Sequence, residues 1–242
     1  MKFSYTGKIH LIIGPMYSGK TTELIRQYNR YSIAGKKCIM VKYRNDQRYN
    51  PKMVVTHDNI KVDALTCLYL YEVDKLVQGY DVICIDEIQF YKDGDIFCDK
   101  WANQGKIVIA CGLNGSYQRT PFPIISNLLP LVENITYSKS VCRETGNDAI
   151  YSKLNNIPKN GNLEVIGGLE KYKAADRKTY FMNNPDCGKL IEFIRIYLEE
   201  NKLREHPKLP INQFVKKFNG PDYVRIVKEY ILQMKKIDSN NE

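Results

Sequence analysis

The segment GPMYSGKT restricts the fold of this chain more than any other part of the sequence. Its spacing is G-x-x-x-x-G-K-[ST], the pattern of a phosphate-binding loop between a strand and a helix. The glycines let backbone N–H groups approach an anion, the lysine adds positive charge for the outer phosphates, and the threonine hydroxyl is a hard ligand for Mg²⁺. The loop residues are Gly14, Pro15, Met16, Tyr17, Ser18, Gly19, Lys20 and Thr21.

The sequence on both sides of the loop predicts the strand and the helix that such a loop needs. Residues 8–13 form an apolar run that is typical of a buried strand. After the loop, large residues recur at helical spacing, and Gly35 is placed to end the helix. These residues are Leu24, Ile25, Tyr28 and Tyr31. The loop does not by itself distinguish phosphate transfer from hydrolysis or a conformational switch.

Later segments extend this pattern into an α/β fold. Residues 38–43, 82–85 and 105–113 predict further buried strands. The polar residues 45–58 predict a loop, and residues 64–80 predict a short strand followed by a helix that ends at Gly79. Strands that alternate with helical segments indicate a mostly parallel sheet. We therefore expect an α/β fold of the P-loop, RecA-like kind, with helices on both faces of the sheet.

Two adjacent acids follow the predicted strand at residues 82–85. They are Asp86 and Glu87, and they stand at the strand's carboxyl end, where open α/β sheets bind ligands. Asp86 is placed to position Mg²⁺ together with Thr21, and Glu87 is placed to orient or deprotonate the nucleophile that attacks the γ-phosphate. The same pair would suit an ATPase or a helicase, but those engines usually need a second motor domain or a neighbouring subunit.

Aromatic residues and prolines follow the predicted strand at residues 105–113. The segment NGSYQRTPFPIISNLLPL lies at a strand's carboxyl end, which suits a flat pocket. Tyr117 has a polar tip and polar neighbours, so we expect it to line a pocket. Phe122 fits either a pocket or the hydrophobic core.

Composition excludes some classes of protein. The 242 residues are 43% hydrophobic, which is enough for a core, but no apolar run approaches bilayer length, so we expect no membrane partner. The net charge of +9 would suit nucleic acid or small anions. Since the basic residues form no block, we expect a solvated surface and no nucleic-acid partner. Seven cysteines without a signal-peptide core fit thiols in a reducing compartment, so we expect a cytoplasmic protein.

Six motifs stand in the chain in the order KIHLIIGPMYSGKTTELIRQYNRY, KYRNDQRY, VVTHD, IDEIQF, ANQGKIVIACGLNGSYQRTPFPIISNLLPL and LEVIGGLEKY. In these residues the chain resembles the type II thymidine kinases, the cytosolic and poxviral kind, over about residues 8–181. The resemblance implies ATP-dependent phosphorylation of the thymidine 5′-hydroxyl, which gives dTMP for DNA synthesis. The implied ligands are thymidine, ATP and Mg²⁺, and the implied assembly is a homotetramer.

The resemblance also implies roles for individual residues. Glu87 is the catalytic base, with Asp86 and Gln89 beside it in the magnesium and nucleotide site. Asp46 and Arg48 belong to the nucleotide-contacting set. The thymine pocket is expected to contain Met16, Leu113, Tyr117 and Phe122. Family members often have phenylalanine at the position of Tyr117. A lasso loop that closes over the nucleoside corresponds to Leu163, Glu164, Val165, Ile166, Gly167 and Tyr172.

The chain departs from the family at the structural zinc site, which two C-x-x-C pairs usually form. Cys142 is retained, but Thr145, Asp176 and Thr179 stand in the other three positions. Hydroxyl oxygens are poor substitutes for thiolates at zinc. We therefore expect a lobe that folds without zinc. Its base would be held by side-chain packing, by a contact of Asp176 with a basic residue, or by the carboxy-terminal helices.

The sequence predicts that the chain has three parts. Residues 1–140 form the nucleotide-binding kinase domain, residues 141–182 form the lasso lobe, and residues 183–242 form an extension of two or three amphipathic helices. One predicted helical stripe consists of Leu190, Ile191, Ile194 and Leu198. The extension either packs on a core of its own or contacts another subunit or protein.

Other functions stay open at this point. The chain could phosphorylate deoxyuridine or another deoxynucleoside. In a different class, it could be a basic, ATP-dependent protein that binds nucleic acid. A member of the family that binds nucleotide without turnover is disfavoured, because Lys20, Thr21, Asp86 and Glu87 are all present.

Overall fold

The computed structural model describes residues 7–46, 53–55, 60–155, 171–182, 187–215 and 223–239. The chain divides into two compact units, Met1–Ala175 and Asp176–Glu242. The three-part division expected from the sequence, with boundaries at residues 140 and 182, stays a prediction. Within the described ranges, no helix is long and apolar enough to cross a bilayer.

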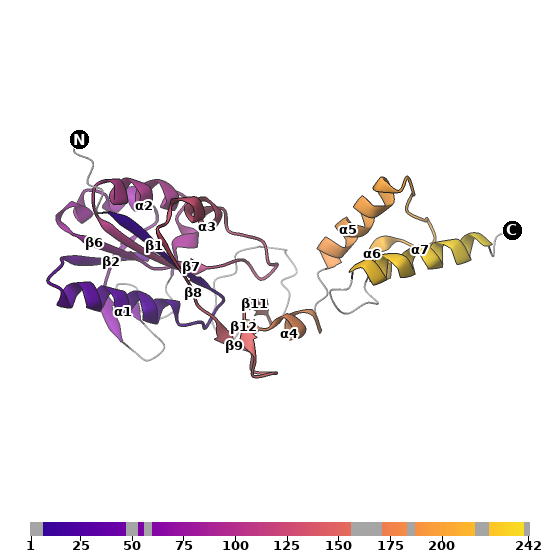
Figure 1. Ribbon diagram of the computed structural model, residues 1–242, viewed down its shortest axis with the longest axis horizontal. Coiled ribbons are helices and arrows are strands. Elements are labelled where there is room, and N and C mark those ends of the chain that lie inside the picture. The colour runs from indigo at the N-terminus through magenta and orange to yellow at the C-terminus, as the bar shows by residue number, and fades with distance from the viewer. Residues whose placement is uncertain are drawn as a thin grey trace. The chain divides into compact units, whose positions relative to one another are not determined.

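A six-stranded sheet forms the centre of the first unit (Figure 1). Its order is β5-β2-β6-β7-β1-β8, and every pairing between neighbours is parallel. The carboxyl ends of all these strands therefore lie at one edge of the sheet. The strands are β1 (Lys8–Gly14), β2 (Cys38–Tyr43), β5 (Leu65–Cys67), β6 (Val82–Ile85), β7 (Ile107–Leu113) and β8 (Asn134–Tyr137).

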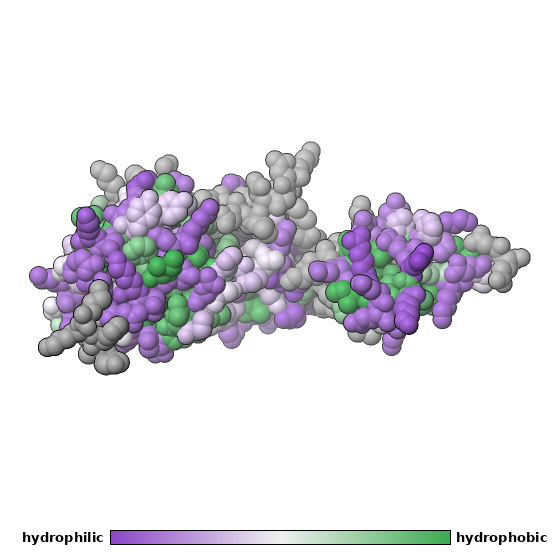
Figure 2. All heavy atoms as spheres, turned by 90° about the horizontal axis from the view of Figure 1, so that it is seen from above, coloured by the Kyte–Doolittle hydropathy of each residue, from purple (hydrophilic) through white to green (hydrophobic). Residues whose placement is uncertain are grey.

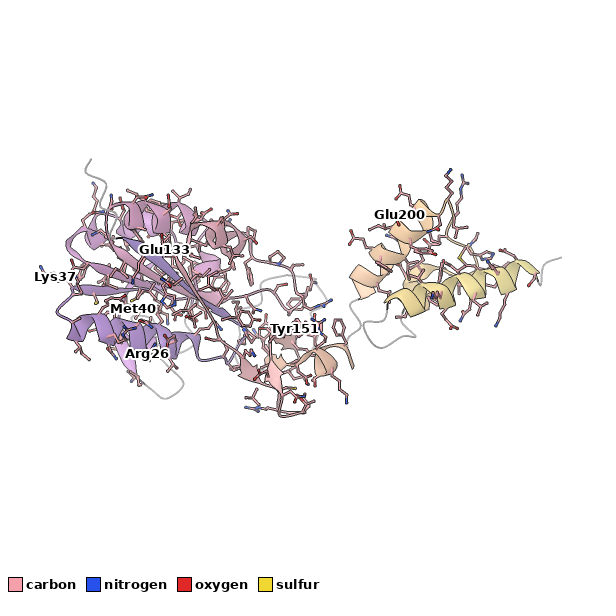
Figure 3. All side chains as sticks on the ribbon, viewed as in Figure 1. Arg26, Lys37, Met40, Glu133, Tyr151 and Glu200 are labelled. Carbon is pink, nitrogen blue, oxygen red and sulfur yellow. The ribbon has the colours of Figure 1, made fainter. Side chains whose placement is uncertain are left out.

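Helices cover both faces of this sheet, as predicted. Helix α1 (Lys20–Ile33) lies on one face, and α2 (Gly94–Asn103) and α3 (Pro123–Leu128) lie on the other (Figure 1). Alternate strand residues serve the two faces, because successive side chains of a strand point to opposite sides. Ile12 packs with Leu24 of α1, and Met40 lies in the same cluster, between α1 and the sheet (Figure 3).

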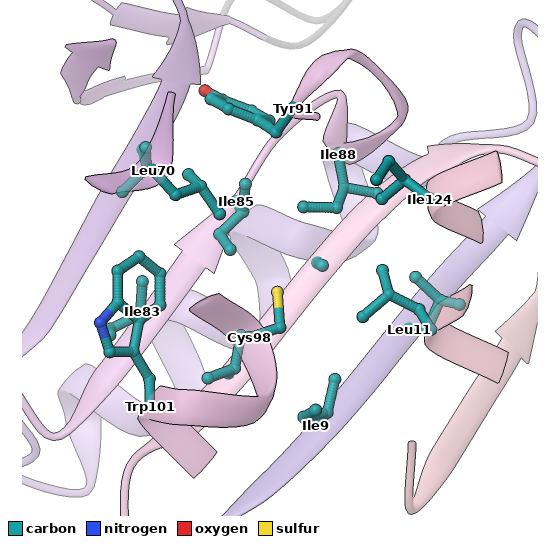
Figure 4. Packing of buried hydrophobic residues seen from close by; sticks show 14 of the residues in the cluster. Ile9, Leu11, Leu70, Ile83, Ile85, Ile88, Tyr91, Cys98, Trp101 and Ile124 are labelled. Atoms are coloured by element: carbon teal, nitrogen blue, oxygen red, sulfur yellow. The ribbon is translucent and has the colours of Figure 1, made fainter. Parts of the chain in front are cut away.

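The larger hydrophobic cluster lies on the face covered by α2 and α3. Figure 4 shows Ile9 and Leu11 of β1 and Ile83 and Ile85 of β6 in this cluster, together with Trp101 of α2. Trp101 is fully buried, and its indole N–H donates to Asp74 Oδ1 at 2.8 Å. The two clusters fix the sheet between its helices and so fix the edge at which the loops meet.

Two segments differ from the expected elements. The predicted helix ending at Gly79 is instead two short 3₁₀ turns, η1 (Leu70–Val73) and η2 (Leu76–Gly79). Side-chain acceptors hold the first turn, because the backbone N–H groups of Leu70 and Tyr71 donate to the Asp93 carboxylate at 3.0 Å each. The Asp93 carboxylate thus satisfies two N–H groups at the start of this turn, which have no partner within the turn itself.

The expected loop over residues 45–58 is wrong at β3 (Met53–Val55). This strand pairs antiparallel with β4 (Lys61–Asp63). Val54 is 1% exposed and belongs to the cluster under α1, so burial of this short apolar run favours a strand over a solvated loop.

A small lobe follows β8 within the first unit. Strands β9 (Ser140–Val141) and β10 (Asp148–Ala149) form one antiparallel pair, and β11 (Tyr151–Leu154) and β12 (Tyr172–Ala175) form another. Strand β12 also contacts β9 and β10. Two further 3₁₀ turns, η3 (Ile88–Phe90) and η4 (Leu129–Leu131), lie in the sheet region.

The second unit is helical and has a hydrophobic core of its own. It contains α4 (Arg177–Met182), α5 (Cys187–Glu200), α6 (Ile211–Phe214) and α7 (Tyr223–Ser239). The predicted stripe is confirmed, since Leu190, Ile194 and Leu198 are buried against Phe214 and Tyr230. On the faces seen in Figure 2, hydrophilic residues cover most of each unit, with hydrophobic residues among them.

Candidate active site

The phosphate loop lies at the carboxyl edge of the sheet, between β1 and α1. Gly19 has φ +75°, a backbone conformation that L side chains rarely adopt, and α1 begins at the next residue. The Lys20 Nζ donates to the Pro15 carbonyl at 2.6 Å, and the Ser18 hydroxyl donates to the same carbonyl at 2.8 Å. The loop therefore curves around the lysine, so that its charge and the helix N-terminus converge on one place.

Gly14 is fixed by a close approach of two backbone segments. A Cβ at this position would lie 2.2 Å from the Ser138 carbonyl oxygen and 2.7 Å from the Ser18 hydroxyl. No side chain fits at such distances. The start of the loop is thus pressed against the segment that leaves β8 for the lobe.

The Asp86 carboxylate lies directly beside the phosphate loop. Its Oδ1 accepts hydrogen bonds from the Thr21 hydroxyl at 3.3 Å, the Glu87 backbone N–H at 3.2 Å and the Cys111 thiol at 2.9 Å. The structure therefore brings together the aspartate and the threonine that the sequence assigns to Mg²⁺. Both present hard oxygen atoms, which are the ligands that Mg²⁺ prefers, so the donor set fits this ion.

Sequence reasoning did not identify Cys111. Burial raises the pKa of this thiol well above its ordinary value, and the neighbouring Asp86 charge raises it further. Cys111 is consequently a protonated donor at neutral pH. The order of the predicted strands could have pointed to it. Asp86 follows β6 and Cys111 lies near the end of β7, so parallel pairing of these two strands brings the residues to the same edge of the sheet.

Glu87 is held in an unusual backbone conformation. Its φ of 55° and ψ of 47° lie in the left-handed region, which is uncommon for a residue with a side chain. Gln89 Nε2 donates to Glu87 Oε2 at 2.5 Å, and Gln89 Oε1 accepts from the Leu113 backbone N–H at 3.1 Å. The predicted base is thus tied through Gln89 to the end of β7.

Gly112 makes this arrangement possible. A Cβ on Gly112 would lie 2.6 Å from Gln89 Oε1 and 2.8 Å from a methyl group of Ile88. The absence of a side chain lets the Gln89 amide reach the backbone of β7.

A separate hydrophobic cluster lies between the loop and the lobe. Met16, Tyr117 and Tyr172, which the sequence assigns to the nucleoside pocket, are buried here together with Leu154, and Leu113 packs against them. Sequence reasoning missed Leu154. The Met16 backbone N–H also donates to the Ser152 hydroxyl at 3.0 Å, which ties the loop to β11. Gln118 Nε2 donates to the Tyr117 hydroxyl at 3.3 Å.

Phe122 does not belong to this cluster. It packs in the main core with Ile124 and Ile125 of α3, where an aromatic side chain fills the space under the helix. Its assignment to the substrate pocket stays a prediction, and the geometry favours the core alternative.

Other expected site residues lie apart or outside the described residues. Asp46 is 3% exposed, and its Oδ2 lies 3.9 Å from Nζ of the equally buried Lys42. Lys42 Nζ also donates to the Met53 carbonyl at 3.2 Å. The structure thus ties Asp46 to β2 and β3. Arg48 and the lasso residues Leu163, Glu164, Val165, Ile166 and Gly167 lie outside the described residues.

A cavity of about 800 Å³ borders the phosphate loop on the side of the lobe. Tyr17 and Ser18 line it from the loop, and Tyr172 and Lys173 line it from β12. The Tyr17 hydroxyl donates to the Tyr172 carbonyl at 3.3 Å.

The lobe is packed around Cys142, which is fully buried with Ala149 and Ala174. Glu144, two residues further on, forms an ion pair with Lys173 of β12 and accepts a contact from the Cys142 thiol at 3.4 Å. The Thr145 hydroxyl accepts from the Asn147 backbone N–H at 3.3 Å. In the second unit, the Asp176 carboxylate accepts from the Thr179 backbone N–H at 2.7 Å.

These contacts do not fit a structural zinc. Among the residues that the structure describes, no cluster of three or more histidine, cysteine, aspartate or glutamate side chains could hold a metal. The Thr145 hydroxyl and the Asp176 carboxylate take backbone N–H donors instead. The expected absence of zinc stays a prediction.

A family model and curated relatives point to the same protein family for this chain. The thymidine kinase family model matches residues 7–180. The thymidine kinase of sheeppox virus (strain KS-1) is 49% identical over 73% of this chain and 98% of its own length. Thymidine kinase 1 of Dictyostelium discoideum is 44% identical over 72% of this chain and 78% of its own.

The thymidine kinase of vaccinia virus (strain Western Reserve) is 44% identical over 72% of this chain and 97% of its own length. A crystal structure titled as a DNA replication initiation factor covers 96% of this chain and 56% of its own, with a TM-score of 0.35 and 12% identity. A likeness at that level supports no functional argument.

Proposed function

Because the chain belongs to the thymidine kinase family, we propose that it transfers the γ-phosphate of ATP to the 5′-hydroxyl of thymidine, giving dTMP and ADP. One observation carries the proposal beyond the family. The Thr21 hydroxyl of the phosphate loop donates to the Asp86 carboxylate, and Glu87 follows in the chain with its own carboxylate bound by Gln89. These contacts support the proposed roles of Thr21 and Asp86 as metal ligands and of Glu87 as the base.

The phosphate loop binds the triphosphate in this proposal. Lys20 neutralises charge on the outer phosphates, and the backbone N–H groups before α1 point at the same anion. The Lys20 bond to the Pro15 carbonyl, at 2.6 Å, supports this role because it keeps the ammonium group inside the curve of the loop.

We further propose that Thr21 and Asp86 hold Mg²⁺. Bound there, Mg²⁺ would neutralise the charge that develops on the transferred phosphate. Thr21 and Asp86 would hold it, and a hydrogen bond from the Thr21 hydroxyl to Asp86 Oδ1, at 3.3 Å, joins the two side chains.

Glu87 is the proposed base that accepts the proton of the 5′-hydroxyl. Phosphoryl transfer depends mainly on positioning and electrostatics, so a base must be held in place. The Gln89 amide provides this, since it joins the Glu87 carboxylate to the backbone of Leu113. The thymine ring is proposed to lie against the cluster of Met16, Tyr117 and Tyr172.

The proposal also covers the assembly, the lobe and the location of the protein. The resemblance to the family supports a homotetramer, and the contacts of Cys142 and Glu144 support a lobe without zinc. The sequence supports a cytoplasmic location, where thiols stay reduced.

The test is to incubate the protein with ATP, Mg²⁺ and a panel of nucleosides and to identify the monophosphates by mass spectrometry. Thymidine is expected to be the preferred acceptor. A preference for deoxyuridine or another nucleoside would contradict the substrate assignment. ATP hydrolysis that DNA stimulates and thymidine does not affect would contradict the reaction itself.

A further inference from the structure

We propose that Cys111 is a positioning residue that orients the Asp86 carboxylate toward the catalytic Mg²⁺. The inference rests on the proposed function and deepens it, because it adds a residue on β7 to a site otherwise built from the phosphate loop and the end of β6.

The sheet places these two residues side by side. Strands β6 and β7 are parallel neighbours with Ile85 opposite Ala110, so the next residue of each strand continues the same register at the carboxyl edge. Those residues are Asp86 and Cys111, and the thiol sulfur lies 2.9 Å from Asp86 Oδ1. The contact therefore follows from the pairing of two central strands and is as rigid as the sheet.

The hydrogen bonds described for the Asp86 carboxylate share one oxygen atom. Thr21, Glu87 and Cys111 all donate to Oδ1. The terminal torsion of an aspartate is broad, so a carboxylate turns easily unless its oxygens are anchored. Donors that gather on Oδ1 fix this torsion, and with it the direction in which Oδ2 points.

The three donors differ in how firmly they are held. The Thr21 hydroxyl rotates, and in the proposed site its oxygen also faces the metal. The Glu87 N–H belongs to a turn with a left-handed backbone. The Cys111 thiol comes from inside the sheet, where the residue is 1% exposed and packs with Ile12, Leu24 and Ile109. A thiol suits this place because it is a small hydrophobic group that can also donate.

If the sulfur is removed, Oδ1 loses the donor that comes from inside the sheet. Partners that orient metal ligands commonly account for about 10–100-fold in metal affinity. We expect an effect at the lower end of this range, since two donors remain.

The experiment measures ADP binding by calorimetry, once in excess Mg²⁺ and once in excess EDTA. In Cys111→Ala, the affinity for ADP in EDTA is expected to match that of the unaltered protein. The gain in affinity on adding Mg²⁺ is expected to fall about 10-fold. Electron paramagnetic resonance of Mn²⁺ titrated into the protein–ADP complex should give a correspondingly higher dissociation constant for the metal. Cys111→Ser, which keeps a donor, should recover most of the loss.

Cys84→Ala is the matched control. Cys84 is fully buried in the same cluster on the neighbouring strand, so its truncation removes the same atoms from the same side of the sheet. In Cys84→Ala, the gain in ADP affinity on adding Mg²⁺ should stay unchanged. If Cys111→Ala does not fold, Cys111→Val fills the space without a donor and should show the same 10-fold loss.

Three results would overturn the proposal. They are an unchanged Mg²⁺-dependent gain in Cys111→Ala or Cys111→Val, an equal loss of ADP affinity in Mg²⁺ and in EDTA, and an equal effect of Cys84→Ala. The measurement needs no nucleoside. If thymidine is not phosphorylated by the unaltered protein while the metal effect is present, the proposed function fails and the role of Cys111 stands.

Discussion

At the scale of single residues, the site depends on hydrogen bonds that fix charged groups. Glu87 and Asp86 are neighbours in the chain, yet different partners hold them. Gln89 binds the Glu87 carboxylate, whereas Thr21 and Cys111 bind that of Asp86. Two adjacent acids can therefore take two separate roles, one as a base and one as a metal ligand.

Glu87→Gln tests the role of the base. The amide keeps the shape of the side chain but cannot accept the proton of the 5′-hydroxyl. We expect kcat to fall by about 100-fold or more, with ATP affinity nearly unchanged. Steady-state kinetics together with nucleotide-binding calorimetry measure both quantities.

The control for this variant is Glu199→Gln, which makes the same change at an exposed position on α5. It should leave kcat unaffected. A Glu87→Gln protein with near-normal kcat would remove Glu87 from the chemistry.

Tyr117→Ala tests the nucleoside pocket. The side chain is 7% exposed and packs with Met16 and Tyr172. An aromatic surface on which a base stacks contributes about 1–3 kcal/mol, so the KM for thymidine should rise by about 5–150-fold while the KM for ATP stays the same. Tyr117→Phe retains the ring and should change the thymidine KM much less. Equal thymidine KM values for the alanine variant and the unaltered protein would place Tyr117 in the core.

Some site residues were predictable from the sequence and others were not. The phosphate loop Gly14–Thr21 has a spacing that reflects its chemistry, and Asp86 stands at the end of a predicted buried strand. The structure brings Thr21 and Asp86 together. The hydrogen bond of Cys111 depends on strand register, which no local pattern specifies. The core position of Phe122 depends on the packing of α3, and that is a tertiary effect as well.

At the scale of elements, the lobe is held by packing and charge across β9, β10 and β12. Cys142, Ala149 and Ala174 form its small core, and the Glu144–Lys173 ion pair joins the turn after β9 to β12. The Lys173 ammonium holds the pKa of Glu144 below its ordinary value of 4.5.

The pH dependence of stability follows from this shift. Since the folded-state pKa of Glu144 is lowered, the pair stabilises the fold fully above about pH 4.5, and this contribution is lost as pH falls through the lower folded-state value. Glu144→Gln should therefore lower the melting temperature at pH 7, and the difference should vanish in acid. The pair is partly exposed, so its contribution is at most about 1 kcal/mol.

Asp148→Asn provides the comparison within the same lobe. Asp148 pairs with Lys139, but its side chain is 65% exposed, so its effect should be smaller still. A melting temperature that is the same for Glu144→Gln and the unaltered protein at pH 7 would contradict this account. So would a large drop on adding a strong chelator, because that result would indicate a zinc-held lobe.

Prediction of elements succeeded where apolar residues follow one another without interruption. The runs at 38–43 and 82–85 coincide with β2 and β6, which are inner strands of a parallel sheet. Residues 70–79 form the turns η1 and η2 instead of a helix, and the Asp93 carboxylate, distant in sequence, accepts from the start of the first turn. Residues 53–55 were misjudged because the burial of Val54 outweighs its polar surroundings.

At the scale of the whole molecule, the chain combines a kinase unit with a separate helical unit. The family model ends at residue 180, close to the division between the units at Ala175, and the viral relatives match over nearly their full length. The sequence predicted the helices of the extension from their apolar stripe, and these helices enclose a hydrophobic core of their own.

Removal of the extension tests how far the two units are independent. A chain of residues 1–182 should fold and phosphorylate thymidine with a kcat/KM close to that of the full chain, because the sheet, the phosphate loop and the described lobe strands lie within it. Circular dichroism and steady-state kinetics measure both properties. A truncated protein that is folded but inactive would show that the extension contributes to catalysis.

One site is proposed to couple ATP cleavage to thymidine phosphorylation. Chromatography of the nucleotides formed in a single reaction, with ³¹P resonance to locate the new phosphate, tests this coupling. ADP is expected to form only when thymidine is present, in equal amount to thymidine 5′-monophosphate. ADP that forms without thymidine, or a phosphate at the 3′-hydroxyl, would contradict the coupling.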